Sequence, residues 1–167
     1  MTSTLQIEIG PATVAETAEL TAMVRTSAAY DGDYHVMVAN QTIDAAYIGA
    51  NATRVARGPD GELLGFTSLL VPGRGEPGEG ELDFMFVADT AQGLGVGRLL
   101  IDDVRAVATG LGLSRVHIVS HPPSAGFYRR CGARDVAVIE PYGRIGWSRP
   151  HLVLDVGQSG RRAALRS

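Results

Sequence analysis

The sequence predicts a mixed α/β (α+β) fold in which helices cover a central sheet within one domain. Two observations predict this fold. Strand-like segments in the first half of the chain are joined by a hairpin turn, whereas those in the second half alternate with helical segments. The chain also has 167 residues without a break in composition, which suits a single domain with its own core.

The first third of the chain contains a strand and a helix. Residues 5–9 (LQIEI) alternate apolar and polar side chains, as a strand does. Thr13 and Glu16 have the spacing of a capping box, which predicts a helix over residues 14–27. The stretch that follows is irregular, and we expect only a short helix there, near residues 43–48.

The middle of the chain predicts three further strands. The turn sequence Gly-Pro-Asp-Gly indicates a hairpin between residues 53–57 and 62–71. The glycine- and proline-rich stretch VPGRGEPGEG is interpreted as a connection, and residues 81–87 as the next strand. Along this strand Glu81 and Asp83 share one face because side chains alternate.

The last part of the chain begins with an amphipathic helix over residues 95–110. Its apolar stripe consists of Val96, Leu99, Leu100, Val104, Val107 and Leu111. The remaining elements are a strand at 115–120, a short helix at 124–131, and strands at 134–139 and 151–156.

Composition argues against several classes of function. The net charge is −3 and the arginines are scattered, which argues against nucleic-acid binding. The chain has no lysine, which excludes a Walker-type lysine and a lysine Schiff base. No apolar run could span a membrane, the first residues lack a secretory pattern, and the single cysteine offers no disulfide framework. We therefore expect a cytoplasmic protein whose residues 157–167 form a disordered basic tail. Arginine in place of every lysine, together with abundant glycine and alanine, indicates a bacterial source with a GC-rich genome.

The stretch QGLGVG at residues 92–97 opens the predicted helix and is the main candidate for a binding site. Backbone N–H groups and the positive end of the helix dipole meet at such a point, which favours an anion. A Walker loop needs a lysine, and a dinucleotide fingerprint needs glycine where Arg98 stands. The alternative interpretation is that these glycines bind no ligand and only allow neighbouring segments to pack closely.

The pattern Q-x-x-G-x-G fits better, and it resembles the acetyl-CoA loop of the GNAT superfamily of N-acetyltransferases. A second motif, AGFYRRCGA at 125–133, resembles the family's A-x-x-F/L-Y-x-x-x-G-F/A helix. The resemblance covers about Glu62 to Asp155. It implies a mostly antiparallel, twisted sheet that splays between its fourth and fifth strands, with helices on both faces. We expect residues 1–156 to form one such domain.

The resemblance implies that acetyl-CoA is the acyl donor and that no metal is needed. Backbone amides of residues 94–98 are expected to receive the pyrophosphate. The family often has asparagine where Pro122 stands, so Ser120, Ser124 or a backbone group is expected to replace it at the pantetheine arm. The full set of expected cofactor-binding residues is Phe86, Val87, Gln92, Gly93, Leu94, Gly95, Val96, Gly97, Arg98, Ser120, Ser124 and Phe127.

Acyl transfer to an amine requires a base, because an ammonium group is not nucleophilic. Glu81 precedes Gln92 by the separation at which some family members carry a glutamate base, and Asp83 lies one pleat nearer the acetyl end. The alternative is that both carboxylates lie on a solvent-exposed face of the strand and have no catalytic role. Tyr128 matches the tyrosine with which many family members protonate the thiolate of CoA, and packing in the core is its alternative.

The four histidines lack metal-ligand spacing. His117 lies within a predicted strand and is expected to be structural. His35 and His151 lie where the family builds its acceptor pocket, so they are alternative bases. Cys131 is expected to be buried filler rather than a nucleophile.

The sequence therefore indicates an N-acetyltransferase that moves acetyl from acetyl-CoA to a primary amine of a small, cationic molecule by direct attack. The acidic and aromatic residues that favour a cationic acceptor are Tyr30, Asp31, Asp33, Tyr34, Asp44 and Tyr47. Acetylation of a protein N-terminus or lysine is the alternative, and a non-catalytic acyl-CoA-binding module is another. We expect no nucleic-acid or membrane partner, and a homodimer is compatible with the sequence.

Overall fold

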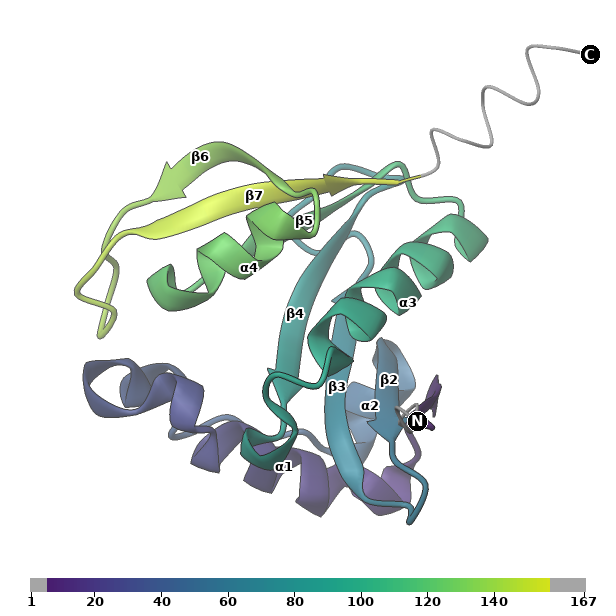
Figure 1. The fold of residues 1–167 in the computed structure, drawn as a ribbon. Coiled ribbons are helices and arrows are strands. Elements are labelled where there is room, and N and C mark those ends of the chain that lie inside the picture. The colour runs from purple at the N-terminus through teal and green to yellow at the C-terminus, as the bar shows by residue number, and fades with distance from the viewer. Residues whose placement is uncertain (1–5, 157–167) are drawn as a thin grey trace, which may run out of the picture. The chain divides into compact units, whose positions relative to one another are not determined.

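The computed structural model describes residues 6–156. The helices are α1 (Thr17–Thr26), α2 (Ala45–Ala50), α3 (Val96–Gly110) and α4 (Ala125–Arg130). Short 3₁₀ segments are η1 (Val14–Glu16), η2 (Ala28–Tyr30), η3 (Gly32–Met37), η4 (Asp89–Ala91) and η5 (Pro122–Ser124). The strands are β1 (Glu8–Pro11), β2 (Ala52–Arg57), β3 (Leu63–Leu70), β4 (Gly80–Val87), β5 (Arg115–Val119), β6 (Arg134–Ile139) and β7 (Arg149–Asp155). Figure 1 labels the main elements.

Within the described residues, seven strands form a sheet in the order β1-β2-β3-β4-β5-β7-β6. Strand β1 pairs antiparallel with β2, and β7 pairs antiparallel with both β5 and β6. Strands β4 and β5 are parallel, with Gly80 opposite Val116 and Glu81 opposite His117, and β4 continues beyond this pairing to Val87. The predicted mixed, mostly antiparallel sheet is therefore confirmed.

The chain divides into two compact units, which are described separately. Within the described residues, the first unit contains 6–68 and 84–100, and the second contains 69–83 and 101–156. The boundary between the units divides β4 and α3, so each of these elements has one segment in the first unit and one in the second.

In the first unit the sheet carries a core on each face. The core that includes α1 consists of Leu20, Val24, Val38, Ile43, Val55, Phe66, Phe84 and Phe86. The opposite core, which includes the start of α3, consists of Ala56, Leu64, Ala91, Val96 and Leu100. Neighbours in sequence such as Val55 and Ala56 enter different cores because strand side chains alternate. Burying one phenylalanine such as Phe66 contributes roughly 1.5–3 kcal/mol.

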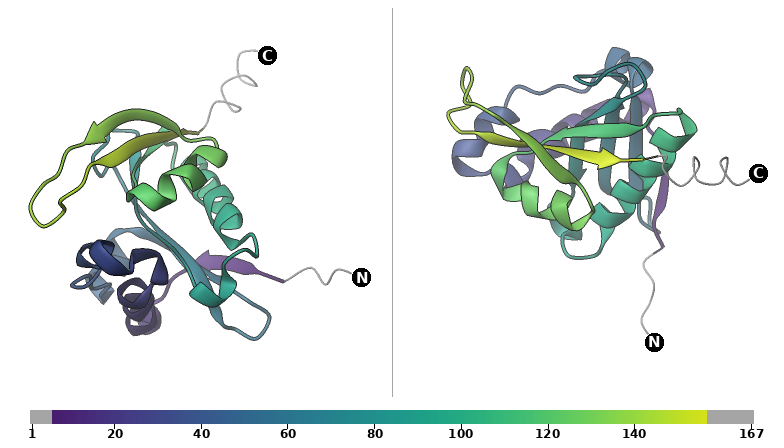
Figure 2. Two further views of the ribbon diagram at one scale, coloured as in Figure 1. Left: turned by 60° about the vertical axis from the view of Figure 1, so that its left-hand side comes forward. Right: turned by 90° about the horizontal axis from the view of Figure 1, so that it is seen from above.

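In the second unit, alternation along β5 and β7 separates an apolar face from a polar one. Val116 and Ile118 of β5 pair with Leu154 and Leu152 of β7, and all four side chains are buried. Figure 1 and the left view in Figure 2 show α3 and α4 on the same side of β7. The alternation places His117 on the face opposite to Ile118.

Most of the predicted elements are confirmed, with shifts at their ends. The predicted helix over 14–27 begins as η1, where the Glu16 carboxylate accepts hydrogen bonds from the Thr13 N–H (2.8 Å) and hydroxyl (3.2 Å). The first strand lies at Glu8–Pro11 rather than at 5–9, and Leu5 lies outside the described residues. The predicted tail at 157–167 also lies outside the described residues.

The apolar stripe of α3 differs from the prediction at both ends. Leu99 and Leu111 are 43 % and 54 % exposed, whereas Ile101 and Ala108 are buried beside the other stripe residues. The helix therefore buries a stripe rotated toward Ile101 and Ala108. Among residues 6–156, no helix is long and apolar enough to cross a membrane.

Candidate active site

The predicted acetyl-CoA loop joins η4 to α3 in the first unit. Gly93 and Gly95 have φ angles of +79° and +81°, a region that glycine adopts without strain. A Cβ atom added at either position would meet no atom within 4 Å. These two positions therefore require glycine because of their backbone conformation and not because neighbouring atoms are close.

This conformation leaves backbone amides at the start of α3. The first i→i−4 bond runs from the Leu99 N–H to the Gly95 carbonyl, at 3.2 Å, so the N–H groups of Val96 and Gly97 precede the ladder of helix bonds. The loop is exposed, with Leu94 at 55 %. Amides at a helix start and the helix dipole together favour an anion at this position.

The end of β4 is tied to the same loop. The Gln92 side-chain amide donates to the Val87 carbonyl at 3.2 Å. The Phe86 ring is buried and stacks on Tyr30 (centroids 5.3 Å apart) and on Phe66 (5.8 Å). Burial raises the pKa of Tyr30 to about 12. The buried Phe86 side chain therefore supports the site from the core, and Gln92 joins the loop to the end of β4.

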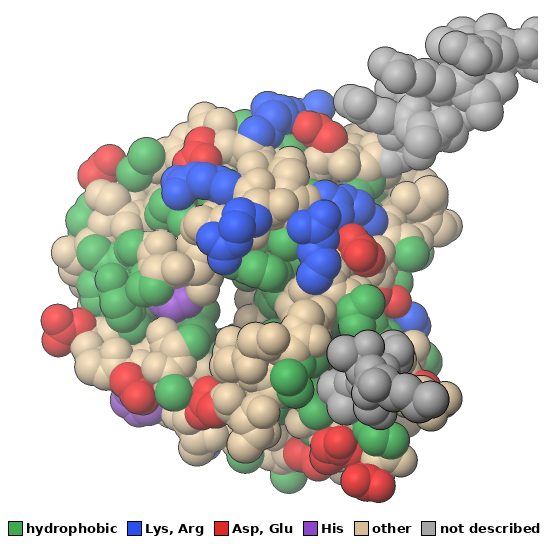
Figure 3. Space-filling view, viewed as in Figure 1, with side chains coloured by type: hydrophobic (Ala, Val, Ile, Leu, Met, Phe, Trp, Pro, Cys, Tyr) green, Lys and Arg blue, Asp and Glu red, His purple; other side chains and the backbone are tan. Residues whose placement is uncertain are grey.

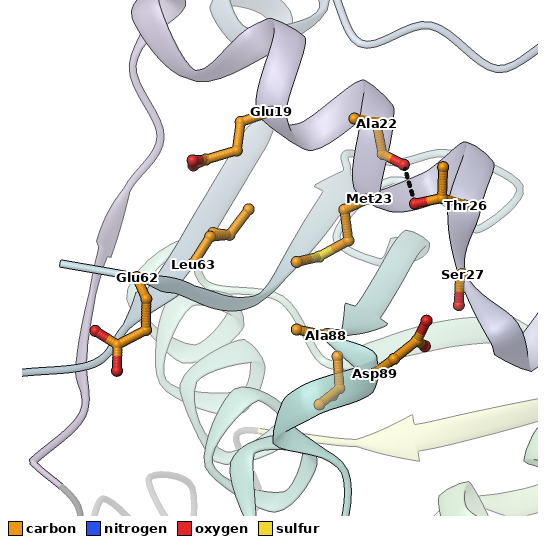
Figure 4. A pocket seen from close by; sticks show the side chains of 10 residues that line it. Glu19, Ala22, Met23, Thr26, Ser27, Glu62, Leu63, Ala88 and Asp89 are labelled. Atoms are coloured by element: carbon orange, nitrogen blue, oxygen red, sulfur yellow. Dashed lines mark hydrogen bonds between the residues drawn. The ribbon is translucent and has the colours of Figure 1, made fainter. Parts of the chain in front are cut away.

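A pocket in the first unit lies beside this strand end (Figure 4). Its lining consists of Glu19, Ala22, Met23, Thr26, Ser27, Glu62, Leu63, Val87, Ala88 and Asp89. The Asp89 carboxylate accepts from the Ala28 N–H at 3.2 and 3.3 Å, and Glu19 pairs with Arg57 at 2.7 Å. Two carboxylates that line the pocket, those of Glu19 and Asp89, therefore stabilise the fold. Of the predicted cofactor-binding residues, Val87 lines this pocket.

Tyr128 lies on α4 in the second unit. The residue is 9 % exposed, and its ring meets Phe127 edge-on, with centroids 5.4 Å apart and an angle of 62°. Its carbonyl accepts from the N–H groups of Cys131 (3.1 Å) and Ala133 (3.0 Å), which ends the helix. This environment fixes the ring, and the proton-donor role of the hydroxyl stays a prediction.

The two predicted pantetheine serines have different surroundings. Ser120 is buried, its hydroxyl donates to the His121 carbonyl at 2.7 Å, and its N–H donates to the Pro150 carbonyl at 3.0 Å. Ser124 is half-buried before α4, and its hydroxyl makes no capping hydrogen bond to the start of that helix. Ser124 is therefore the better placed of the two to bind a ligand.

The two predicted carboxylate bases also differ. Glu81 accepts from the Arg74 backbone N–H at 3.0 Å and from Arg74 Nε at 3.1 Å, and its side chain is 16 % exposed. Asp83 is exposed. The Glu81 carboxylate is thus held by the Arg74 loop, whereas the Asp83 side chain lies on an exposed part of the same strand. The role of each as base stays a prediction.

A chain of three side chains lies next to Glu81. His117 Nε2 is 2.9 Å from Glu79 Oε1, and His117 Nδ1 is 2.9 Å from His151 Nε2. Arg115 Nε lies 2.9 Å from the other Glu79 oxygen. His117 was expected to be structural, yet it joins a carboxylate to the alternative base His151.

The glycine-rich stretch before β4 encloses these carboxylates. A Cβ at Gly75 would lie 2.7 Å from Glu79 Cβ and 3.0 Å from His117 Cδ2. A Cβ at Gly73 would lie 2.4 Å from Glu81 Cβ. These two glycines therefore let the loop approach the acidic side chains. The sequence analysis interpreted this stretch only as a connection and did not predict this role.

The protonation states in this cluster are set by its neighbours. The backbone N–H of Glu76 and the His117 side chain lower the pKa of Glu79, so that this carboxylate stays ionised. Burial lowers the pKa of His151, and the charges of His117 and Arg74 lower it further, against the opposing effect of Glu81. His151 is therefore neutral at pH 7.

Arginines gather over α4 and β6 in the second unit (Figure 3). Arg129 forms a two-pronged pair with Asp135, both bonds being 2.8 Å. Arg134 pairs with Asp155 at 2.8 and 3.2 Å. Carboxylates on the same unit thus neutralise much of this basic surface.

Several residues of the expected acceptor side serve the fold of the first unit. The Asp44 carboxylate caps α2 by accepting from the Tyr47 N–H at 2.8 Å, and the Tyr47 hydroxyl donates to Ser68 at 2.8 Å. Tyr30 is half-buried against Phe86. Asp31 and Asp33 are exposed, so they are the acidic members of the set that remain available to a ligand.

A comparison with family models identifies the chain. Residues 18–133 match the model described as the acetyltransferase (GNAT) family. The chain belongs to this family. As a GNAT acetyltransferase it is an acyltransferase, and the glycine loop and the Tyr128 motif lie within the matched residues. A search of curated proteins finds no match.

Solved structures share the GNAT fold. The IAA acetyltransferase from Bacillus cereus is 17 % identical, with a TM-score of 0.68 over 90 % of this chain and 100 % of its own. An acetyltransferase from Bacillus subtilis in complex with CoA is 24 % identical, with a TM-score of 0.62 over 92 % and 99 %. A putative acetyltransferase from Salmonella typhimurium with acetyl-CoA is 19 % identical, with a TM-score of 0.70 over 92 % and 95 %.

The contacts that the sequence did not predict are those of His117 with Glu79 and with His151. Glu79 sits in a stretch interpreted as a connection, two residues before the predicted base Glu81. A signal existed, since charged residues flanked by glycines directly before a buried strand are costly without a partner. The partner lies 38 residues away, and only the parallel pairing of β4 with β5 reveals it. Among the described residues, no group of histidine, cysteine and acidic side chains is suited to hold a metal ion.

Proposed function

We propose that this GNAT acetyltransferase transfers the acetyl group of acetyl-CoA to a primary amine of a small, cationic molecule by direct attack. The observation that carries the proposal is the Gln92–Arg98 loop, where two left-handed glycines precede a 15-residue helix in a chain of this family. Its amides bind the pyrophosphate, and the backbone of Phe86 and Val87 binds the pantetheine arm and orients the thioester.

The chemistry requires a neutral amine and a protonated leaving group. A base in the second unit takes a proton from the ammonium, and Glu81, Asp83 and His151 are the candidates. The neutral amine then attacks the thioester carbonyl and the C–S bond breaks. Tyr128 donates its proton to the departing thiolate, a step that general acid catalysis typically accelerates by ~10²–10⁴-fold.

A cationic acceptor is supported by the exposed carboxylates Asp31 and Asp33 in the first unit. Opposite charges raise the local concentration of a ligand and its rate of association. The acceptor proposal therefore rests on these two residues rather than on the six that the sequence suggested.

Mass spectrometry tests the proposal. The protein is incubated with acetyl-CoA and a panel of amines that contains polyamines, amino acids, aminoglycoside-like amines and lysine peptides. We expect an added acetyl group on a small polycationic amine, and none with Gly95→Glu. Acetylation confined to peptides would assign a protein substrate. Acetyl-CoA binding without any acetylated amine would indicate a non-catalytic acyl-CoA-binding module.

A further inference from the structure

The Glu79–His117–His151 chain has the geometry of a proton relay. Both contacts are 2.9 Å, within hydrogen-bond range, and both histidines are half-buried. We propose that His151 is the general base of the acetyl transfer, with Nδ1 as the basic atom, and that Glu79 and His117 position it. This inference rests on the proposed function, since it names the base for that reaction.

Hydrogen-bond direction fixes the tautomer of each ring. An ionised Glu79 carboxylate only accepts, so His117 Nε2 carries a proton and donates it. In its neutral form His117 has a lone pair on Nδ1, to which His151 Nε2 donates, whereas a positive charge on His117 would reverse the direction of this bond. The second nitrogen of His151, Nδ1, is left with a lone pair. A carboxylate two side chains away therefore sets which nitrogen of His151 is basic.

The same chain carries the charge away once a proton arrives. His151 Nδ1 takes a proton from the ammonium, and the His151 Nε2 proton shifts to His117 Nδ1. The positive charge then lies on His117, next to the Glu79 carboxylate. Arg115 also contacts Glu79, so it limits how strongly that carboxylate stabilises the imidazolium.

Burial lowers the pKa of His151 most, and the surrounding charges modify this effect before the reaction. Arg74 and His117 oppose a positive charge on its ring, and Glu81 favours one. Arg74 is paired with Glu81, which weakens the effect of both.

The complete reaction forms one bond and breaks another. The N–C bond forms, the C–S bond breaks, and the thiolate receives the Tyr128 proton. The amine loses two protons: one passes through His151 and His117 to solvent, and the other returns to Tyr128 through water. An ammonium and acetyl-CoA thus give an amide, free CoA and one proton.

The tautomers can be measured without any substrate. ¹⁵N-histidine labelling and two-bond ¹H–¹⁵N spectra at pH 7.5 distinguish a protonated Nε2 from a protonated Nδ1. We expect both His117 and His151 to be Nε2–H tautomers, assigned with His117→Gln and His151→Gln. In Glu79→Gln the amide can donate to His117 Nε2, so we expect a population with protonated Nδ1. A protonated Nδ1 on His151 in the wild type would overturn the proposal.

The catalytic part is tested by kcat/KM at pH 5–9 with the amine identified above. We expect His151→Gln to lower kcat/KM by ~10²-fold or more, as loss of a general base does. Glu79→Gln should lower it by about 10-fold, in the range typical for a residue that orients another. The matched control is Glu76→Gln, which changes an exposed carboxylate in the same loop. The backbone N–H of residue 76, which donates to Glu79, is retained in this variant. Added imidazole should partly restore His151→Ala.

Two results would overturn the relay. His151→Gln with wild-type kcat/KM would remove His151 as base, and Glu79→Gln indistinguishable from Glu76→Gln would remove the positioning role. A wild type that acetylates no amine, yet shows the expected tautomers, would instead contradict the proposed function. The spectra and the kinetics therefore separate the two failures.

Discussion

The glycine loop of the first unit and the histidine relay of the second unit are built in opposite ways. The loop is a contiguous segment, residues 92–98, and it offers backbone amides whose positions follow from two glycine φ angles. The relay joins side chains that are 38 and 34 residues apart and depends on the pairing of three strands. A backbone site can be recognised in a short motif, whereas a side-chain site becomes visible only after the topology is known.

Gly95→Glu is expected to have the largest effect, because it tests the backbone site directly. A glutamate at φ +81° is strained, and its charge repels the pyrophosphate. We expect the affinity for acetyl-CoA to fall by more than about 100-fold, a loss of at least ~2.7 kcal/mol. Calorimetry on the folded variant measures it, with Gly49→Glu on exposed α2 as the matched control. Unchanged affinity would show that the loop does not bind the donor.

Tyr128→Phe tests whether the second unit supplies the acid as well as the base. The change removes a hydroxyl and little volume, so we expect kcat to fall by roughly 10- to 300-fold with KM for acetyl-CoA almost unchanged. Steady-state kinetics measure both parameters, and circular dichroism checks the fold. If the variant stays within threefold of wild type while chemistry limits the rate, Tyr128 is a packing residue.

Gly75→Ala asks whether the side-chain site depends on close approach by the loop. A Cβ at 2.7 Å from Glu79 Cβ forces a shift, and such overpacking typically costs 1–3 kcal/mol. We expect kcat/KM to fall by about tenfold while acetyl-CoA affinity is retained. Gly146→Ala is the control, because a Cβ there meets no atom within 4 Å. Equal kinetics for the two variants would contradict a role of Gly75 in positioning Glu79.

The pair of Glu16 and Arg57 is a distant side-chain contact without an expected catalytic role. Burial alone would raise the pKa of Glu16, but hydrogen bonds from Arg57 and Thr13 lower it overall. A lowered pKa in the folded state means that the stabilisation is present above about pH 4.5 and is lost as the pH falls further. We expect Glu16→Gln to lower the free energy of unfolding by about 1 kcal/mol at pH 7 and by less at pH 3.5.

Urea unfolding at both pH values measures this difference, and kcat should stay at the wild-type value. A Glu16→Gln effect that is the same at pH 7 and pH 3.5 would contradict the ion-pair explanation. A fall in kcat would instead connect this side of the first unit to the chemistry.

Short-range sequence patterns were sufficient to predict most of the helices and strands. The capping box at Thr13, the turn after Arg57 and the stripe of α3 are short-range features, and each predicts an element that the structure contains. The direction in which the α3 stripe turns was not predictable, because Ile101 and Leu99 are equally apolar and only tertiary packing decides which is buried. The start of β1 was misplaced for the same reason, since its extent depends on pairing with β2.

The site divides in the same way. The loop at 92–98 and Tyr128 were found from motifs, whereas the Arg74 partner of Glu81 was not, because nothing in the spacing of residues 74 and 81 indicates an ion pair. The six acidic and aromatic residues of the expected acceptor side looked alike in the sequence. Hydrogen bonds and burial then assigned Asp44, Tyr47 and Tyr30 to the fold.

The use of arginine rather than lysine in the ion pairs of the described residues has a chemical consequence for a protein that binds acetyl-CoA. Each basic partner of Glu16, Glu81, Asp135 and Asp155 is a guanidinium, and none of the 167 residues is a lysine. A guanidinium stays protonated at any physiological pH and is a poor nucleophile toward thioesters, whereas a lysine amine reacts when it loses its proton. The electrostatic contacts that stabilise both units are therefore inert toward stray acetylation by the protein's own donor. Prolonged exposure to excess acetyl-CoA should leave these ion pairs, and the stability they provide, chemically unchanged.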